Sequence, residues 1–440
     1  MKIIFKITKE MLERIKNDLA RPHPFALERV GFINIRRGTI ADGQLLLATS
    51  YQPVRDENYT KAKANDCAGA IINRYAITEA MQKVLKTGEG VFHVHMHHFD
   101  FFGEAFSRVD LQSLNELMPS FYSVSKNALH GALLLTPKNI LGKYWTRDKM
   151  SHDLIMISVI GHPCFYQKKR SEPINIERYS RQSFLGDSSD EIISQRTIGI
   201  VGVGGGGSHI VQQLSHLGCK KFVLYDPDII SISNLNRTVG STEKDVRLQS
   251  KKIEIARRVI NSLHADASIR AFDKRWQIEP EPLRECDIVF GCVDKYQERH
   301  ELEVSMRRYL IPYIDIGLTV VHHKPRPPLM SGHIFLSMPG KPCMWCLGIL
   351  SERKLADEAK DYGDTGPRPQ VVWSNGMLAS TAVGIAVDLI TGWTQQASGI
   401  AYMLYEGNSG ILKPHARLRE IDLTKQCSHH QLVNIGDPVF

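Results

Sequence analysis

The sequence has no long run of one residue class. Its opening residues, MKIIFKITKEMLERIKND, are charged throughout and lack the apolar centre of a secretory signal. The most apolar later stretch, Leu378 to Trp393, contains Asp388 and is too short to cross a bilayer comfortably. Lys and Arg exceed Asp and Glu by eight, but they are spread along the chain. We therefore expect a cytoplasmic protein with no membrane or nucleic-acid partner.

Cysteine is also scarce, with eight in 440 residues. In the absence of a secretory signal, these cysteines favour reduced thiols, a metal site or a reactive thiol over a disulfide framework. Two of them form the pair Cys343-x-x-Cys346, a spacing that requires its own explanation.

Length and pattern predict two α/β domains. A chain of 440 residues exceeds what one hydrophobic core usually supports. Short apolar runs and helical patterns continue to about residue 166, and the polar stretch QKKRSEPIN then interrupts them. We expect a smaller α/β domain over 1–166, a linker over 167–177 and a second domain over 178–440.

The second domain opens with a strand, a glycine-rich turn, a helix and another strand, TIGIVGVGGGGSHIVQQLSHLGCKKFVLYD. This order predicts a doubly wound parallel sheet. Gly202, Gly204 and Gly205 would let phosphate oxygens approach the backbone and the helix N-terminus. Asp226, at the end of the second strand, would bond ribose hydroxyls. Later strands are expected at 268–272, 288–291, 313–317 and 332–336.

These features alone fit an NAD-binding oxidoreductase equally well. Arg237, Lys251 and Asp294, which follow the second strand and a later one, favour adenylation instead. Adenylation needs cations that bind the triphosphate and a carboxylate that holds Mg²⁺, whereas hydride transfer needs no such set. Taken singly, each of these residues also fits an ordinary solvated surface charge.

The segment from Tyr179 to Trp393 resembles the ThiF/MoeB/ubiquitin-activating adenylation family. The matching pieces are, in order, RYSRQ at 178–182, the glycine loop, Asp226-Pro227-Asp228, Asn234 with Arg237, Lys251, and Asp294 with Arg299. The resemblance implies a Rossmann-like domain that binds ATP and Mg²⁺ and forms a homodimer. The implied contacts are Gly204 and Gly205 with the nucleotide, Asp226 with the ribose, Asn234, Arg237 and Lys251 with phosphates, Asp294 with Mg²⁺, and Arg181 with the ATP of the other subunit.

The cysteine pair has a counterpart near the C-terminus. This family often closes a structural zinc site with a second Cys-x-x-Cys, and here the corresponding place reads Cys427-Ser428-His429-His430. We expect a zinc site of Cys343, Cys346, Cys427 and His430. The alternative is two buried thiols and an unrelated cysteine in the tail.

The thioester cysteine of a ubiquitin-activating enzyme has no clear counterpart. Related enzymes sometimes carry it in a crossover loop, but the segment Ser351 to Gln370 contains no cysteine. The chain therefore either stops at the adenylate or passes it directly to an outside thiol.

The first domain resembles JAB/MPN-type zinc peptidases. In that family two histidines and an aspartate bind zinc and a glutamate activates water; the similar residues here are His93, His95, Asp110 and Glu28. The family usually has seven residues between the second histidine and a serine, whereas eleven separate His95 from Ser107. The alternative is an inactive domain that recognises the ubiquitin-like partner.

The combined pattern resembles the activating enzymes of bacterial ubiquitin-like conjugation operons, including anti-phage operons of the Bil type. The expected activity is ATP-dependent adenylation of a ubiquitin-like protein that ends in a free glycine, for transfer to a conjugating enzyme. One alternative is adenylation of a sulfur-carrier protein for cofactor or siderophore synthesis. Another is a scaffold that binds nucleotide without turnover.

Overall fold

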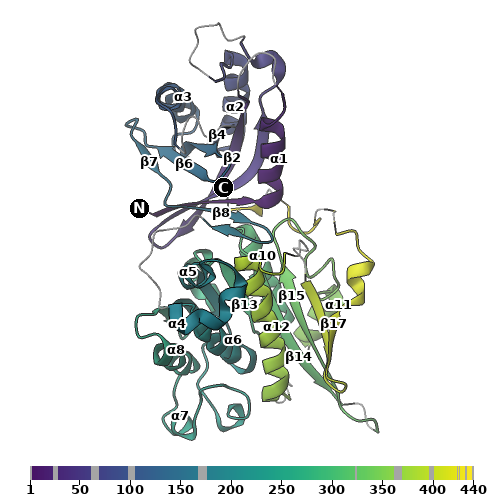
Figure 1. Ribbon diagram of the computed structural model, residues 1–440. Coiled ribbons are helices and arrows are strands. Elements are labelled where there is room, and N and C mark those ends of the chain that lie inside the picture. Colours follow the sequence, from purple (N-terminus) through teal and green to yellow (C-terminus); the bar gives the residue numbers. More distant parts are fainter. Residues whose placement is uncertain are drawn as a thin grey trace. The chain divides into compact units, whose positions relative to one another are not determined.

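The computed structural model describes residues 2–22, 28–60, 69–97, 105–166, 176–322, 325–360, 369–395, 401–423, 425, 427–431 and 434–438. Figure 1 shows the course of the chain. It divides into two compact units, of which unit 1 comprises residues 1–160, 165–168 and 432–440, and unit 2 comprises residues 161–164 and 169–431. Most of the linker expected at 167–177 lies outside the described residues.

Unit 1 is a nine-stranded mixed sheet covered on both faces. Its strand order is β7-β6-β5-β4-β2-β3-β1-β8-β9. The strands are β1 (Lys2–Thr8), β2 (Val30–Ile40), β3 (Gly43–Pro53), β4 (Gly90–Met96), β5 (His130–Leu135), β6 (Ile140–Trp145), β7 (Ser151–Asp153), β8 (Met156–Ile160) and β9 (Phe165–Tyr166). The helices are α1 (Lys9–Leu19), α2 (Arg74–Thr87) and α3 (Arg108–Val124).

Two apolar cores lie on the two faces of this sheet. Helix α1 buries residues at helical spacing, including Met11, Ile15 and Leu19, in one core. Helices α2 and α3 contribute to the other core. Helix α3 begins at a capping box in which Ser107 and Asp110 bond each other's backbone N–H groups. This capping box sets the first turn of α3 and therefore the position of Asp110.

Unit 2 is built on an eight-stranded sheet of order β12-β11-β10-β13-β14-β15-β16-β17. The strands are β10 (Thr197–Val201), β11 (Lys221–Tyr225), β12 (Ser268–Phe272), β13 (Ile288–Gly291), β14 (Tyr313–Val321), β15 (Leu329–Ser337), β16 (Ala401–Glu406) and β17 (Ile411–Pro414). The helices are α4 (Ile176–Tyr179), α5 (Ser189–Gln195), α6 (Gly205–His216), α7 (Glu243–Arg247), α8 (Lys252–Leu263), α9 (Glu281–Arg284), α10 (Tyr296–Arg308), α11 (Glu352–Lys360) and α12 (Val372–Thr391).

The first five strands in this order are parallel, and the last three run antiparallel to their neighbours. Helices α6 and α8 pack against each other, α6 also contacts β10, and α8 contacts β12. Helix α12 packs against α6, and α10 packs against β13 and β14. The strand order reverses between β10 and β13, the position where parallel α/β sheets bind ligands.

Each unit includes a short segment from a distant part of the sequence. In unit 2, the Cys164 N–H donates to the Leu389 carbonyl, and His162 lies 2.8 Å from Asp388. In unit 1, the Asp437 carboxylate accepts hydrogen bonds from the N–H and hydroxyl of Thr39. The C-terminal residues thus complete the N-terminal unit.

Within the described ranges, no helix is both long enough and apolar enough to pass through a lipid bilayer.

Candidate functional site

The glycine loop after β10 adopts a backbone that side chains would obstruct. Gly202 has a φ of 86°, and a Cβ there would lie 2.6 Å from the Cys292 carbonyl oxygen. A Cβ on Gly207 would lie 1.9 Å from the Gly202 carbonyl oxygen, so α6 can approach β10 only with glycine at this position. Helix α6 begins at Gly205, and its N-terminal N–H groups face a cavity.

This cavity has a volume of 290 Å³ and lies at the point where the strand order reverses. Residues from several separate segments of unit 2 line it. They include Gly202, Gly204, Gly205, Asp226, Asn234, Arg237 and Asp294, all expected from the sequence to contact nucleotide or Mg²⁺. Among these expected residues, the structure brings together positions that are up to 92 apart in the sequence, counted from Gly202 to Asp294.

Asp226 is held rigidly at the end of β11. One carboxylate oxygen accepts the Val203 N–H at 2.8 Å, and the other accepts the Asp228 N–H at 2.9 Å. Burial raises the pKa of Asp226 above its usual value. Each oxygen keeps a further lone pair, so the carboxylate can still accept a ribose hydroxyl.

Of the two adjacent lysines at the start of α8, Lys252 lines the cavity and the expected Lys251 does not. The Nζ atom of Lys252 lies 2.7 Å from an Asp228 carboxylate oxygen. Lys251 is the N-cap residue and has an extended backbone, whereas Lys252 is the first helical residue. Lys274 and Lys295 also line the cavity.

A buried ion pair supports the segment that carries Asp294. Arg299 donates hydrogen bonds to the Val293 and Ile316 carbonyls and to the Asp315 carboxylate. Asp315 is fully buried and also accepts from the Tyr313 hydroxyl at 2.8 Å. Burial alone would raise the pKa of Asp315, but Arg299 and a neighbouring histidine lower it below its usual value.

Arg181 lies on an exposed 3₁₀ helix, Ser180–Leu185, and its side chain does not line the cavity of its own chain. Its expected contact with the ATP of a second subunit therefore stays a prediction.

Residues 178–427 match the model of the ThiF family, and this match covers more than half of the chain. The chain belongs to the ThiF family. The match begins just before the 3₁₀ helix that carries Arg181, ends at Cys427, and includes every residue of the cavity described above.

Two curated relatives have the name ubiquitin-like modifier-activating enzyme 5. That of Dictyostelium discoideum is 28% identical over 215 residues, which are 44% of this chain and 53% of the relative. That of Aedes aegypti is 26% identical over 211 residues, which are 44% of this chain and 51% of the relative. The chain spans about half the length of these relatives. Among solved structures, E. coli MccB with succinimide has a TM-score of 0.46 at 19% identity, over 54% of this chain and 71% of that chain.

The second site of this ThiF-family chain is a cluster of three cysteines and a histidine. The Sγ atom of Cys346 lies 3.7 Å from those of Cys343 and Cys427. The Nδ1 atom of His429 lies 3.5, 3.4 and 3.9 Å from the sulfurs of Cys343, Cys346 and Cys427. Zn–S bonds of about 2.3 Å in a tetrahedron separate sulfurs by about 3.8 Å. The four residues therefore fit zinc.

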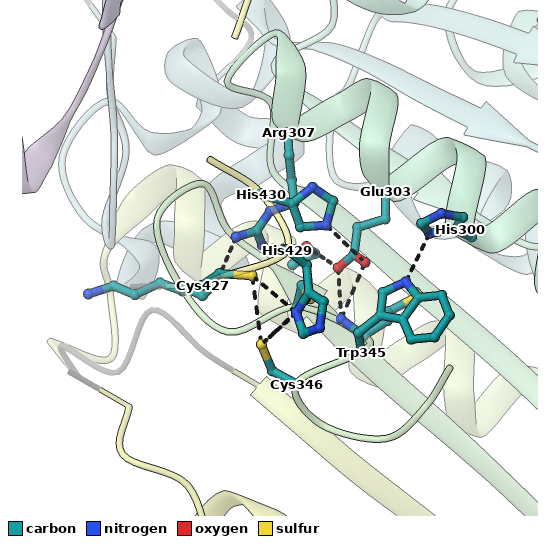
Figure 2. A network of polar contacts seen from close by, with 12 residues as sticks. His300, Glu303, Arg307, Trp345, Cys346, Cys427, His429 and His430 are labelled. Atoms are coloured by element: carbon teal, nitrogen blue, oxygen red, sulfur yellow. Dashed lines mark hydrogen bonds and ion pairs between the residues drawn. The ribbon is translucent and has the colours of Figure 1, made fainter. Parts of the chain in front are cut away.

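The fourth member of the cluster is His429, whereas the sequence led us to expect His430. His430 points to the other side, where its Nε2 lies 3.7 Å from a Glu303 carboxylate oxygen (Figure 2). Cys427 and His429 both belong to the three-cysteine cluster, whereas His430 groups with Glu303 and Cys343. A Cys-x-His spacing thus closes the site, in place of the expected Cys-x-x-His.

A third cluster lies in unit 1 at the end of β4. The Nε2 atoms of His95 and His97 are each 3.6 Å from an Asp110 carboxylate oxygen, and that of His97 is 3.9 Å from Glu28. Both histidines are buried. Burial, partly offset by His95, raises the pKa of the Glu28 carboxyl above its usual value. Two imidazoles and a carboxylate at these separations fit a zinc ion.

His93, which the sequence placed in this metal site, is not part of the cluster. Its side chain lies on the same face of β4 as His95, two residues further into the strand, and packs edge-on against Phe32. Burial lowers the pKa of His93 to about 3. The pair is therefore His95 and His97, from which Ser107 is separated by nine residues (107 − 97 − 1).

The described cysteines provide no obvious thioester nucleophile. Cys164, Cys219 and Cys286 are buried, and Cys343, Cys346 and Cys427 form the cluster. Burial raises the pKa of Cys219 to about 12. Cys292 lines the nucleotide cavity, but burial and nearby carboxylates raise its pKa well above the usual value. The eighth cysteine, Cys67, lies outside the described residues.

Proposed function

We propose that this chain adenylates the C-terminal carboxylate of a ubiquitin-like protein and passes it to a conjugating enzyme of a bacterial conjugation pathway. One observation carries the proposal: the glycine loop, Asp226, Arg237, Lys252 and Asp294 meet in a single cavity. The names of the curated relatives support the choice of a ubiquitin-like substrate.

The chemistry needs positioning and charge stabilisation. One oxygen of the partner's carboxylate attacks the α-phosphorus of ATP, the bond between that phosphorus and the α,β-bridging oxygen breaks, and pyrophosphate leaves with the electron pair. Arg237 and Lys252 would stabilise the charge that develops on the leaving group, and Asp226 would orient the ribose. Asp294 would hold Mg²⁺, whose charge screens the triphosphate. No general base is needed because the carboxylate is already ionised.

We also propose that the active form is a homodimer in which Arg181 of one copy reaches the nucleotide of the other. The exposed position of Arg181, outside its own cavity, supports this arrangement. A cation supplied by the partner would complete the triphosphate site only in the dimer.

A sulfur-carrier protein is the second candidate substrate. The observation that favours it is the absence of a suitable thioester nucleophile among the described cysteines. With either substrate, the adenylate would pass directly to a thiol outside this chain.

ATP–pyrophosphate exchange with Mg²⁺ and candidate partners that end in glycine tests the main proposal. We expect exchange that needs the partner and is lost in Asp294→Asn. Asp266→Asn is the matched control, because that side chain is 68% exposed and pairs only with Lys220 on the surface. Tight ATP binding without exchange, with every candidate partner, would refute adenylation.

For unit 1 we propose a JAB/MPN-like metallopeptidase that cleaves bonds to the C-terminus of the ubiquitin-like partner. His95, His97 and Asp110 would hold zinc, and Glu28 would exchange a proton with water. A zinc ion there would polarise the scissile carbonyl. We expect about two zinc ions per chain in the wild type and about one in His97→Ala, with cleavage of a linear ubiquitin-like fusion lost. His152→Ala, on the exposed strand β7, should change neither the zinc content nor the cleavage. Cleavage that survives His97→Ala would refute the proposed zinc peptidase site.

A further inference from the structure

Helix α10 connects the nucleotide cavity to the cysteine–histidine cluster. Asp294 and Lys295 line the cavity immediately before the helix begins at Tyr296, and Glu298 and Arg299 in its first turn line it as well. The segment from Ser337 to Lys360, which contains the cysteine pair and α11, contacts α10 from its last turn to its first. We call this segment the brace.

The C-terminal half of α10 forms hydrogen bonds with the brace around the cysteine pair (Figure 2). Glu303 is fully buried, and its carboxylate accepts the Met344 N–H at 3.0 Å and the Ser337 hydroxyl at 2.6 Å. Met344 directly follows the metal-ligand candidate Cys343. Arg307 donates to the Lys341 carbonyl and to the Ser337 hydroxyl. One side of the helix therefore holds the backbone from which the metal ligands project.

The same face continues one turn closer to the cavity. The indole N–H of Trp345 donates to the Nδ1 atom of His300 at 3.1 Å. The ring of Trp345 also stacks on that of His429, with centroids 6.1 Å apart and an interplanar angle of 25°. His429 is the imidazole of the cluster, so an ion bound there would fix the position of Trp345 through a direct ring contact.

The N-terminal end of α10 is capped by the far end of the brace. The two carboxylate oxygens of Glu358, on α11, accept the N–H groups of Tyr296 and Gln297, each at 3.0 Å. Lys295, at the N-cap position, makes no side-chain capping bond. Glu358 therefore takes the place of a local cap, with the negative charge that a helix N-terminus favours.

A lysine connects the two parts of the brace. Lys354 on α11 donates to the Ile349 carbonyl at 2.7 Å, which ties α11 to the turn that follows the cysteine pair. Its Nζ also lies 5.3 Å from the centre of the Tyr296 ring. The contacts form a continuous path from Cys343 through Lys354 to the first turn of α10.

We propose that Glu303 and Glu358 are positioning residues that clamp α10 to the brace, so that metal binding at the cysteine–histidine cluster fixes Asp294 in the nucleotide cavity. The nucleotide part of this inference rests on the proposed adenylation; the metal part does not. Glu358 belongs neither to the cavity lining nor to the cysteine–histidine cluster, so the coupling passes through the brace and helix α10.

The test compares Glu358→Gln with Glu352→Gln in the full-length, metal-loaded protein. Both residues lie on α11, but Glu352 is exposed and lies six residues before the capping carboxylate. Hydrogen exchange without nucleotide should be about fivefold faster at Tyr296 and Gln297 in Glu358→Gln, and unchanged in the control. MgATP should bind about tenfold more weakly, and ATP without Mg²⁺ should lose less affinity, because the displaced group is Asp294.

Removal of the metal with a chelator gives the second readout. We expect the wild type to show the same faster exchange at Tyr296 and Gln297 after metal removal, and Glu358→Gln to respond less, because its clamp is already broken. Equal MgATP affinity and equal exchange in Glu358→Gln and Glu352→Gln would overturn the proposal. If the wild type shows no ATP–pyrophosphate exchange, the proposed adenylation is wrong. Amide hydrogen exchange at Tyr296 and Gln297 still decides whether Glu358 clamps α10 to the brace.

Discussion

His429→Ala and His430→Ala offer a sharp test of the metal site, because the two residues are adjacent and only His429 groups with all three cysteines. The Nδ1 atom of His429 lies within 3.9 Å of all three sulfurs. His430 instead faces Glu303. The first substitution should remove a zinc ligand, and the second should remove only a neighbour of the site.

The size of the difference follows from the ligand count. Structural zinc sites bind with an apparent free energy of about 10–16 kcal/mol, so each of four ligands contributes about 3 kcal/mol. His429→Ala should therefore weaken zinc binding by roughly a hundredfold or more. His430→Ala should weaken it by about tenfold, the lower end of what is typical for a residue outside the ligand set.

Competition with a chromophoric zinc chelator measures both affinities in the folded protein. His429 is exposed, so its truncation leaves no buried cavity that would confuse the measurement. The reasoning would be refuted if His430→Ala weakened zinc binding more than His429→Ala, or if neither substitution changed it.

Lys252→Ala should raise KM for MgATP at least tenfold in pyrophosphate exchange, whereas Lys251→Ala should change it less than twofold; the reverse order would refute the placement of Lys252. Neither Arg181→Ala nor Asp294→Asn should be active alone, but an equimolar mixture should recover about a quarter of wild-type exchange, since half of the dimers would contain one intact site. No recovery after subunit exchange would exclude a contact in trans. Arg299→Met should lower the free energy of unfolding by about 3–5 kcal/mol in urea titrations, because it removes the arginine partner of the buried Asp315 carboxylate. The pKa of that carboxylate is lowered in the folded state, so its contribution should be complete above pH ~4 and should be lost as the pH falls further.

The parallel core of unit 2 could be predicted from sequence because each of its strands has a local signal. The strands expected at 268–272 and 288–291 are β12 and β13, and those expected at 313–317 and 332–336 lie within β14 and β15. The direction of β15 could not be predicted in this way. A buried apolar run looks the same whether the strand is parallel or antiparallel, since direction depends on the connection before it.

The site residues that differ from expectation share one physical cause. In each case two or three residues of the same type lie close together, as in Lys251-Lys252 and His429-His430. Composition and spacing identify the type of side chain that the site needs. Which neighbour faces the site depends on where a helix or turn begins, and that is fixed by capping and packing. The structure places Lys252 in the cavity lining and His429 in the cysteine cluster, each one position from the expected residue, and it places His97 in the third cluster where His93 was expected.

The cysteines restrict how an acyl adenylate formed in this cavity could react further. Cys292 is the described cysteine that lines the cavity, and burial beside carboxylates disfavours its thiolate. A thiol that attacked the adenylate would have to be one other than the described cysteines of unit 2, as the proposed transfer to a partner's thiol requires. Because the α-phosphate would lie near the glycine loop, such a thiol must reach the open side of the cavity beside Gly204, where a Cβ would meet no atom within 4 Å. The proposed direct transfer thus requires that this side stay accessible after pyrophosphate has left.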